Sequence, residues 1–212
     1  MKDAADLLDL DHLPALGPAG YRRGKRLLDI GAVVILAPLA APVVAAAGAV
    51  ILLTMGWPVF FSQPRVGLGG REFLILKLRT MRKAGEGGER ATAIKDGRVT
   101  PFGRWLRRFH IDELPQLWNV LTGEMSLVGP RPEQPGLAAA YAQQAPGFAY
   151  RQLVRPGITG WGQVHAGYAG DLEEIRVRLV YDLFYLRNVS LGLDLEICGR
   201  TIWVILSGHG AR

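Results

Sequence analysis

The chain has 212 residues, of which 49% are hydrophobic, and its formal net charge of +6 corresponds to a pI near 9.8. This length suits one compact domain with an appendage, and the basic balance suits an anionic partner such as a bilayer surface, a nucleotide or a nucleic acid. The single cysteine, Cys198, excludes an intramolecular disulfide framework and the usual zinc-binding spacings, and it favours a reducing compartment.

The N-terminal quarter divides into a lead-in and an apolar segment. Residues 1–20 mix acids, leucines, prolines and glycines and are predicted to form a loose lead-in. No residue from Ile30 to Pro64 is charged, and the 26 residues from Ile30 to Met55 would extend about 39 Å as a helix, against a hydrocarbon core of roughly 30 Å. Residues 21–56 are therefore predicted to enter a membrane.

Two features of this segment argue against a simple crossing. Pro38 and Pro42 each remove a backbone donor and clash with the preceding turn, which predicts a break or a strong kink. Basic residues flank the segment at 22–26 and again at 65–83, so the positive-inside rule places both ends in the cytoplasm. We expect a re-entrant helix hairpin that bends at these prolines. An ordinary spanning helix and a secretory signal ending near "VVAAAGAV" are the alternatives.

The remaining chain, residues 57–212, has the patterns of a small α+β domain. "WPVFFSQPRVGLGGREFLILKLRTM" predicts two short strands around a turn at Gly67 to Gly70, and the polar stretch "KAGEGGERATAIKDGR" predicts a surface loop. "TPFGRWLRRF" predicts a basic amphipathic helix with Trp105, Leu106 and Phe109 on one face, against lipid or the core. Further helices are expected at 133–146, 171–187 and 193–206, the last at the membrane interface, with the loop "RPGITGWGQVHAGYAG" before the second.

Two adjacent acids, Asp112 and Glu113, open the stretch "DELPQLWNVL". The apolar spacing after them predicts a helix, so Asp112 is a candidate N-cap with Glu113 in the first turn. A helix N-terminus is also where phosphates bind, and neighbouring side chains there point in different directions. One carboxylate could then attack phosphorus while the other holds Mg²⁺, which bridges carboxylates and phosphates. The residues alone leave both interpretations open.

Two neighbouring carboxylates require positive charge nearby. Three guanidinium groups shortly precede the acids, those of Arg104, Arg107 and Arg108. Arg131, held between two prolines in "PRP", could make paired hydrogen bonds to a phosphate at low entropic cost, or it could be a surface arginine in a turn.

Together these features resemble the bacterial sugar transferase family, whose small monotopic members load a sugar phosphate onto polyprenyl phosphate. The resemblance runs from about Lys25 to Thr201 and rests on ordered matches: "KRLLD", the broken apolar run, "VFFSQPRVGLGGREFLILKLRTM", "DGRVTPFGRWLRR", "DELPQLWNVLTGEMSLVGPRP", "RPGITGWGQV" and "YDLFYLRNVSLGLDL". It implies a mostly helical α+β monotopic membrane protein with a re-entrant helix hairpin, a short β-hairpin and interfacial amphipathic helices. Residues 57–212 would form a catalytic domain on the cytoplasmic face of the bacterial inner membrane.

The resemblance also implies a role for each matching residue. Asp112 would attack the β-phosphate of a nucleotide-diphosphate sugar, a UDP-sugar by preference, to give an aspartyl sugar-phosphate and a nucleoside monophosphate. Polyprenyl phosphate would then accept the sugar phosphate, and Glu113 would bind Mg²⁺. The residues expected around the substrate phosphates and the nucleotide are Lys77, Arg79, Arg98, Arg107, Arg131 and Gln163.

The chain departs from the family pattern beside the acids and in a later loop. His110 and Ile111 replace a Ser or Thr followed by Leu, and His165 with Ala166 replaces a frequent Asn-Gly. Participation of the two histidines, the identity of the sugar and the formation of a homodimer stay open. The rival hypothesis is a noncatalytic basic module that binds anionic lipid of the inner membrane or recruits a partner enzyme. Nucleic-acid binding is not expected, because no recognised motif accompanies the arginines.

Overall fold

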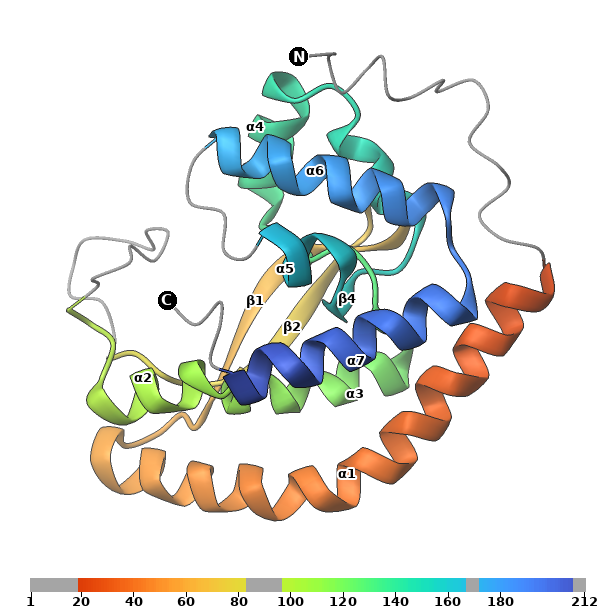
Figure 1. Cartoon of the computed structure of the whole chain (residues 1–212). Coiled ribbons are helices and arrows are strands. Elements are labelled where there is room, and N and C mark those ends of the chain that lie inside the picture. The colour runs from red at the N-terminus through yellow and green to blue at the C-terminus, as the bar shows by residue number, and fades with distance from the viewer. Residues whose placement is uncertain (1–18, 83–96, 167–171, 208–212) are drawn as a thin grey trace.

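The computed structural model describes residues 19–82, 97–166 and 172–207, and within them the chain is mostly helical (Figure 1). Strands β1 and β2 form an antiparallel pair, and β3 and β4 form a short parallel pair. The elements in chain order are α1 (Ala19–Met55), β1 (Phe60–Val66), η2 (Leu68–Gly70), β2 (Glu72–Leu78), α2 (Pro101–Arg108), η3 (Ile111–Gln116), α3 (Leu117–Thr122), β3 (Ser126–Val128), α4 (Pro135–Gln144), η4 (Phe148–Leu153), β4 (Gly157–Thr159), α5 (Trp161–Ala166), α6 (Leu172–Arg187) and α7 (Leu191–Ser207).

Helix α1 is 37 residues long and contains both Pro38 and Pro42. Figure 1 shows it bent along its length, with the convex side turned away from the rest of the chain. Prolines inside a helix account for such a bend, because each removes a hydrogen bond and crowds the preceding turn. The structure therefore has one bent helix where we expected a hairpin, and the re-entrant hairpin is not confirmed. Of the predicted lead-in, residues 1–18 lie outside the described residues.

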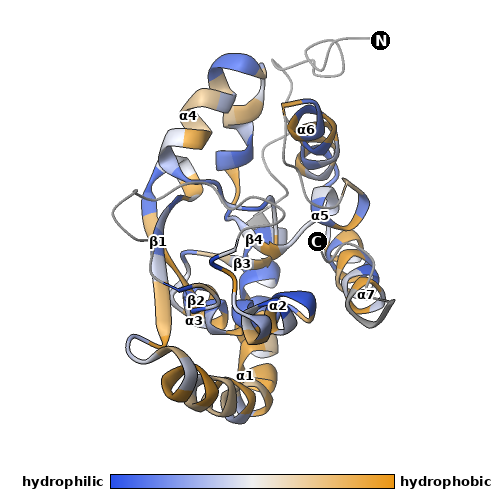
Figure 2. Cartoon of the chain, turned by 90° about the vertical axis from the view of Figure 1, so that its left-hand side faces the viewer, coloured by the Kyte–Doolittle hydropathy of each residue, from blue (hydrophilic) through white to orange (hydrophobic). Residues whose placement is uncertain are grey.

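Much of the surface of α1 is exposed. Its large apolar side chains are exposed on several sides, up to 86% for Leu53. The exposed set comprises Leu27, Leu28, Val34, Ile35, Leu36, Leu39, Val43, Val50, Leu52 and Leu53. Figure 2 shows this helix in orange at one end of the molecule. An exposed helix that is apolar all round suits lipid rather than water, and α1 is the one described helix whose length and composition allow it to cross a bilayer. The structure therefore supports membrane association.

The inner side of α1 packs on the β-hairpin. Val33 lies in one buried cluster with Phe73 and Ile75 of β2, and Ile51 lies in another with Leu78. Since β2 also contacts η3 directly, α1, β2 and the turn that carries the acids form one continuous packed unit.

The predicted β-hairpin is confirmed. β1 and β2 pair from Phe60↔Leu78 to Val66↔Glu72, and the connecting turn falls in the predicted Gly67 to Gly70. Gly69 and Gly70 have φ angles of +64° and +76°, a region that L side chains rarely adopt.

The predicted basic helix is confirmed as α2, which begins after Thr100. The Thr100 hydroxyl accepts a hydrogen bond from the amide of Gly103 at 2.9 Å and so caps the helix. Leu106 is fully buried against α1 and β2, whereas Trp105 and Phe109 are half exposed. The three side chains therefore do not share one environment as we expected: Leu106 anchors α2 to the core, and the two aromatic rings remain outside.

The later helices are confirmed as α4, α6 and α7. They lie on the side of the β-hairpin opposite the outer face of α1, with α4 and α6 farthest away (Figure 1). The expected loop "RPGITGWGQVHAGYAG" is wrong for most of its length, because it contains β4 and α5. The sequence pattern does not indicate β4, because this strand depends on the close approach of two glycine backbones. A Cβ on Gly157 would lie 2.1 Å from the amide nitrogen of Gly129. Tertiary contact, and not local propensity, forms this strand.

Candidate active site

The two adjacent acids lie in a tight turn between α2 and α3. The chain passes through His110 in the left-handed region, with φ +54°, and then enters the 3-10 helix η3. His110 occupies the N-cap position and makes no side-chain cap, while Asp112 lies inside the helix. The interpretation of Asp112 as an N-cap is therefore wrong, because the left-handed residue starts the helix before Asp112 is reached. Packing against β2 and α2 buries both Asp112 and Glu113, which are each 7% exposed.

Glu113 binds two cations, chiefly through Oε1. The Lys77 ammonium donates to Oε1 at 2.7 Å, and Arg131 donates through Nη2 to Oε1 at 2.6 Å and through Nη1 to Oε2 at 3.4 Å. Burial opposes ionisation of this carboxyl, but the charges of Arg131 and Lys77 outweigh it and hold the pKa of Glu113 well below its ordinary value. Glu113 is therefore a fixed anion that orients both cations.

Asp112, by contrast, is not bound by a neighbouring side chain among the described residues. Within the described part of the chain its carboxylate accepts no hydrogen bond and makes no ion pair. Neither of its oxygens is sealed from solvent. Burial and the neighbouring charge of Glu113 raise the pKa of Asp112, while Lys77, Arg107 and His110 pull it down. The Asp112 carboxylate thus retains access to solvent and is not committed to a structural contact.

The structure brings Lys77, Arg107 and Arg131 together around the acids. Arg107 on α2 donates from Nε to the Thr80 hydroxyl at 2.9 Å, and its charge acts on Asp112. The three cations come from β2, α2 and the chain after β3, so the site forms only when these elements pack. This arrangement agrees with their predicted place near phosphate groups, although their substrate contacts stay predictions.

Arg79 and Arg98 have other contacts. Arg79 donates from Nη2 to the carbonyls of Met55 and Gly56, at the carboxyl end of α1, and is itself buried. A cation at a helix C-terminus complements the unpaired carbonyls and the helix dipole. Arg98 lies in a turn where its carbonyl accepts from the Arg82 amide at 3.0 Å. The substrate roles expected for these two arginines stay predictions.

Gln163 lies on α5, where its Nε2 donates to the Ile158 carbonyl at 2.8 Å and its buried Oε1 has no partner. This contact joins α5 to β4, and none of its described contacts reaches the acids. Of the two unusual histidines, His110 has Nδ1 4.0 Å from Glu113 Oε2, whereas His165 contacts the Trp161 carbonyl and stacks on Tyr181. Only His110 therefore lies beside the acidic pair.

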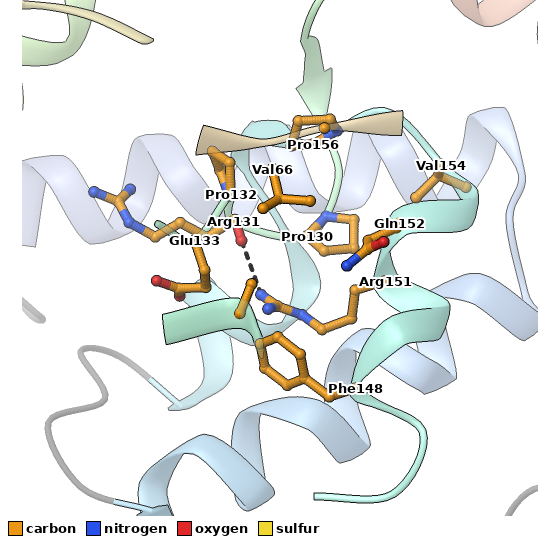
Figure 3. A pocket seen from close by; sticks show the side chains of 12 residues that line it. Val66, Pro130, Arg131, Pro132, Glu133, Phe148, Arg151, Gln152, Val154 and Pro156 are labelled. Atoms are coloured by element: carbon orange, nitrogen blue, oxygen red, sulfur yellow. Dashed lines mark hydrogen bonds between the residues drawn. The ribbon is translucent and has the colours of Figure 1, made fainter. Parts of the chain in front are cut away.

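The segment of residues 130–133 carries Arg131. Each of its four backbone carbonyls accepts a hydrogen bond. The donors in chain order are the Gly157 amide at 3.0 Å, Arg151 Nη2 at 2.9 Å, Arg65 Nη1 at 3.1 Å and the Val66 amide at 2.9 Å. Figure 3 shows Arg151 on one side of the segment, hydrogen-bonded to the Arg131 carbonyl, while the Arg131 guanidinium extends away from it. The cavity in that view holds about 20 Å³, room for about one water, and is therefore not a sugar-nucleotide site.

Sequence reasoning missed Arg151 and its buried partner Asp182. Asp182 stands in the apolar helical stretch "LVYDLFYL", flanked by core residues, and an acid at such a position signals a buried cation. No comparable signal distinguishes Arg151 from the other arginines, because its partners are distant in the sequence.

The acidic pair suits a metal ion held jointly with a substrate and does not form a ready-made metal cage. No group of three or more potential metal-ligating His, Cys, Asp or Glu side chains occurs in residues 19–82, 97–166 and 172–207. Mg²⁺ usually binds through one or two carboxylates together with substrate phosphates and water. Glu113 Oε2 is the more loosely held oxygen of that carboxylate, with Arg131 Nη1 at 3.4 Å and His110 Nδ1 at 4.0 Å, and it fits that donor set.

Comparison with known proteins gives consistent matches over nearly the whole chain. The model of the bacterial sugar transferase family matches residues 20–208. The chain is 46% identical over 209 residues to a UDP-N-acetylgalactosamine-undecaprenyl-phosphate N-acetylgalactosaminephosphotransferase of Aeromonas hydrophila, covering 98% of this chain and 49% of that protein. It is 44% identical over 190 residues to a UDP-glucose:undecaprenyl-phosphate glucose-1-phosphate transferase of Caulobacter vibrioides, covering 88% of this chain and 71% of the relative. The chain thus spans about half the length of the first relative.

Proposed function

The chain belongs to the bacterial sugar transferase family, and from this membership and the geometry of the acidic pair we propose that it transfers a sugar 1-phosphate from a nucleotide-diphosphate sugar to polyprenyl phosphate. The named relatives use UDP-sugars and undecaprenyl phosphate, which makes the same substrate classes the natural candidates here. The observation that carries the proposal is the contrast between two adjacent buried carboxylates: Glu113 is fixed by Lys77 and Arg131, whereas Asp112 is unpaired.

The proposed reaction has two displacements at phosphorus. An Asp112 oxygen attacks the β-phosphorus, the bond from that phosphorus to the bridging oxygen breaks, and the nucleoside monophosphate leaves with the bond electrons. The product is an aspartyl sugar-phosphate. A phosphate oxygen of the polyprenyl phosphate then attacks the same phosphorus, which releases the Asp112 carboxylate and gives a polyprenyl-diphosphate sugar. No proton transfer is needed at the reacting oxygens, so catalysis depends on positioning and neutralisation of charge.

The residues around Asp112 can supply that neutralisation. Lys77, Arg107 and Arg131 surround the acids, and we assign them to the phosphate oxygens of the substrate. Mg²⁺ held by Glu113 and the substrate phosphates would add further neutralising charge when bound. Glu113 also keeps Lys77 and Arg131 in place before substrate arrives, because both cations bind the same carboxylate.

We further propose that α1 enters the inner membrane from the cytoplasmic face and returns to it. The exposed apolar surface and the outward-facing convex side of the bend support this topology, as do the basic residues on both flanks (Figure 1). The half-exposed Trp105 and Trp118 would lie at the headgroup level, where aromatic side chains are favoured. Asp112 would then act close to the headgroups, where the phosphate of a polyprenyl lipid is found.

The topology has a direct test by cysteine labelling. In a Cys198→Ser background, single cysteines at Arg23 and Glu72 flank the apolar helix, and both positions are exposed. We expect neither cysteine to react with a membrane-impermeant maleimide added outside intact spheroplasts, and both to react after lysis. Labelling of Arg23→Cys alone from outside would instead establish a spanning helix.

The reaction itself is tested by product release. Membranes that contain the chain are incubated with polyprenyl phosphate and a panel of UDP-sugars, and UMP and the lipid product are measured. We expect release of UMP with at least one sugar, matched mole for mole by polyprenyl-diphosphate sugar. Binding of the chain to anionic vesicles without UMP release from any nucleotide sugar would favour the noncatalytic membrane module.

A further inference from the structure

A buried Arg–Asp pair stands directly behind the segment that carries Arg131. Arg151 on η4 donates from Nε to Asp182 Oδ2 at 2.8 Å, and from Nη2 to the Arg131 carbonyl at 2.9 Å (Figure 3). Its guanidinium also lies over the Phe148 ring, 4.5 Å from the centroid. One planar group is thus fixed by three contacts at once, and only a guanidinium offers donors at these two angles together with a flat face for the ring.

The pair is poorly suited to a purely stabilising role. Asp182 is 2% exposed, and its burial raises the pKa of the carboxyl even though Arg151 and Arg178 oppose that shift. Removing two charges from water costs free energy, and here the attraction between them offsets only part of that cost. Such a pair contributes little to stability compared with apolar packing. Its geometric effect is strong, however, because it fixes the carbonyl of Arg131.

Arg131 is consequently held from both sides. Its carbonyl accepts from Arg151, its guanidinium binds Glu113 at 2.6 Å, and Pro130 and Pro132 restrict the backbone before and after it. Few rotations remain by which the guanidinium could move relative to the acids. A displacement of about 1 Å at such a position costs roughly 10²-fold in rate.

We propose that Arg151, oriented by Asp182, is a positioning residue that sets the location of Arg131 in the active site. The proposal rests on the proposed transferase function for its kinetic consequence, but its structural part does not. Arg151 acts through the backbone of Arg131 and touches neither substrate nor the reacting atoms.

Hydrogen exchange tests the structural part. In Arg151→Lys the single ammonium cannot reach both acceptors, so the amides of Gly157 and Val66, which donate to the carbonyls of Pro130 and Glu133, should exchange their hydrogens at least several-fold faster than in the wild type. Asp182→Asn, which keeps the shape and removes the charge, should do the same to a smaller extent. The matched control is Asp194→Asn, which removes a buried carboxylate that pairs with Lys25 at 2.8 Å and has no contact with residues 130–133. Unchanged exchange of the Gly157 and Val66 amides in both variants would overturn the proposal.

A double-mutant cycle tests the kinetic part. Arg151→Lys should raise the KM for the nucleotide sugar and lower kcat/KM by roughly 10²-fold, without changing the KM for polyprenyl phosphate. In an Arg131→Ala background the same substitution should have almost no further effect, because the residue it positions is gone. Equal losses in both backgrounds would overturn the proposal.

The two measurements separate this proposal from the proposed function. Faster exchange of the Gly157 and Val66 amides in the variants, with no UMP release from the wild-type chain, would contradict the transferase and leave the positioning role intact. UMP release by the wild-type chain, with the same kcat/KM in Arg151→Lys, would contradict the positioning role alone. Refolding problems in one variant do not remove the test, because Asp182→Asn is isosteric and gives a second measure of the same contact.

Discussion

Replacing Asp112 by Asn is expected to lower turnover by roughly four orders of magnitude or more, because an amide cannot form the aspartyl sugar-phosphate. With a UDP-sugar labelled in its sugar phosphate and no lipid acceptor, quenched wild-type protein should carry the label. The Asp112→Asn protein should carry none. Both are measured on protein separated from free nucleotide under denaturing conditions.

The same substitution should leave the fold intact and slightly stabilise it. Burial and the charge of Glu113 raise the pKa of Asp112 in the folded state, so its ionised form costs stability at neutral pH. The sign follows: this cost shrinks as pH falls through the raised pKa and is gone below the ordinary value of 3.8, and removing the charge at pH 7 removes the cost. We expect the unfolding midpoint of Asp112→Asn to equal or exceed that of the wild type.

Asp194→Asn gives the matched control. It also neutralises a buried aspartate, but one that is paired with Lys25 and hydrogen-bonded to Tyr185, so it should lower the midpoint while retaining activity. Substantial label on Asp112→Asn protein would exclude Asp112 as the nucleophile. A clear loss of stability in that variant would show that its carboxylate is engaged in the fold.

The elements predicted correctly are those whose signals are local. The β-hairpin follows from two β-rich runs around a turn in which Gly69 and Gly70 adopt left-handed angles, and α2 follows from Thr100 before an amphipathic run. Each signal lies within about ten residues, so neighbouring side chains are sufficient to specify the conformation. By contrast, β4 depends on the close approach of the Gly157 backbone to Gly129, and no local pattern records this.

The candidate site follows the same distinction. The acids and Arg131 stand out because their neighbours in the sequence are unusual, and the structure places Glu113 and Arg131 in contact although they are 18 residues apart. The hydrogen bonds of Arg79 could not be read in this way, because its acceptors are backbone carbonyls 23 and 24 residues earlier, and every residue carries such an acceptor. The side chains of Arg151 and Asp182 meet only after α6 folds against η4.

Replacing Glu113 by Gln should have the largest effect on stability. The change keeps the shape of the side chain but leaves Lys77 and Arg131 without their shared anion. Removal of one partner from a buried ion pair costs about 3–5 kcal/mol, and both cations here are largely buried. Activity should also fall by roughly 10²-fold, because the two cations lose their fixed positions. Denaturant unfolding at constant m value measures the first effect, and UMP release measures the second.

The pH dependence identifies the charge of Glu113 as the cause. Because the folded-state pKa lies well below the ordinary value of 4.5, ionised Glu113 stabilises the fold at every pH above 4.5, and this contribution is lost as pH falls through the folded-state pKa. The stability gap between wild type and Glu113→Gln should therefore be widest near neutral pH and narrow progressively below 4.5. Glu196→Gln, which removes an exposed ion pair with Arg200, should cost less than about 1 kcal/mol throughout. A gap that stays constant into the acid range would mean that shape or packing, and not the anion shared by Lys77 and Arg131, holds the two cations at the site.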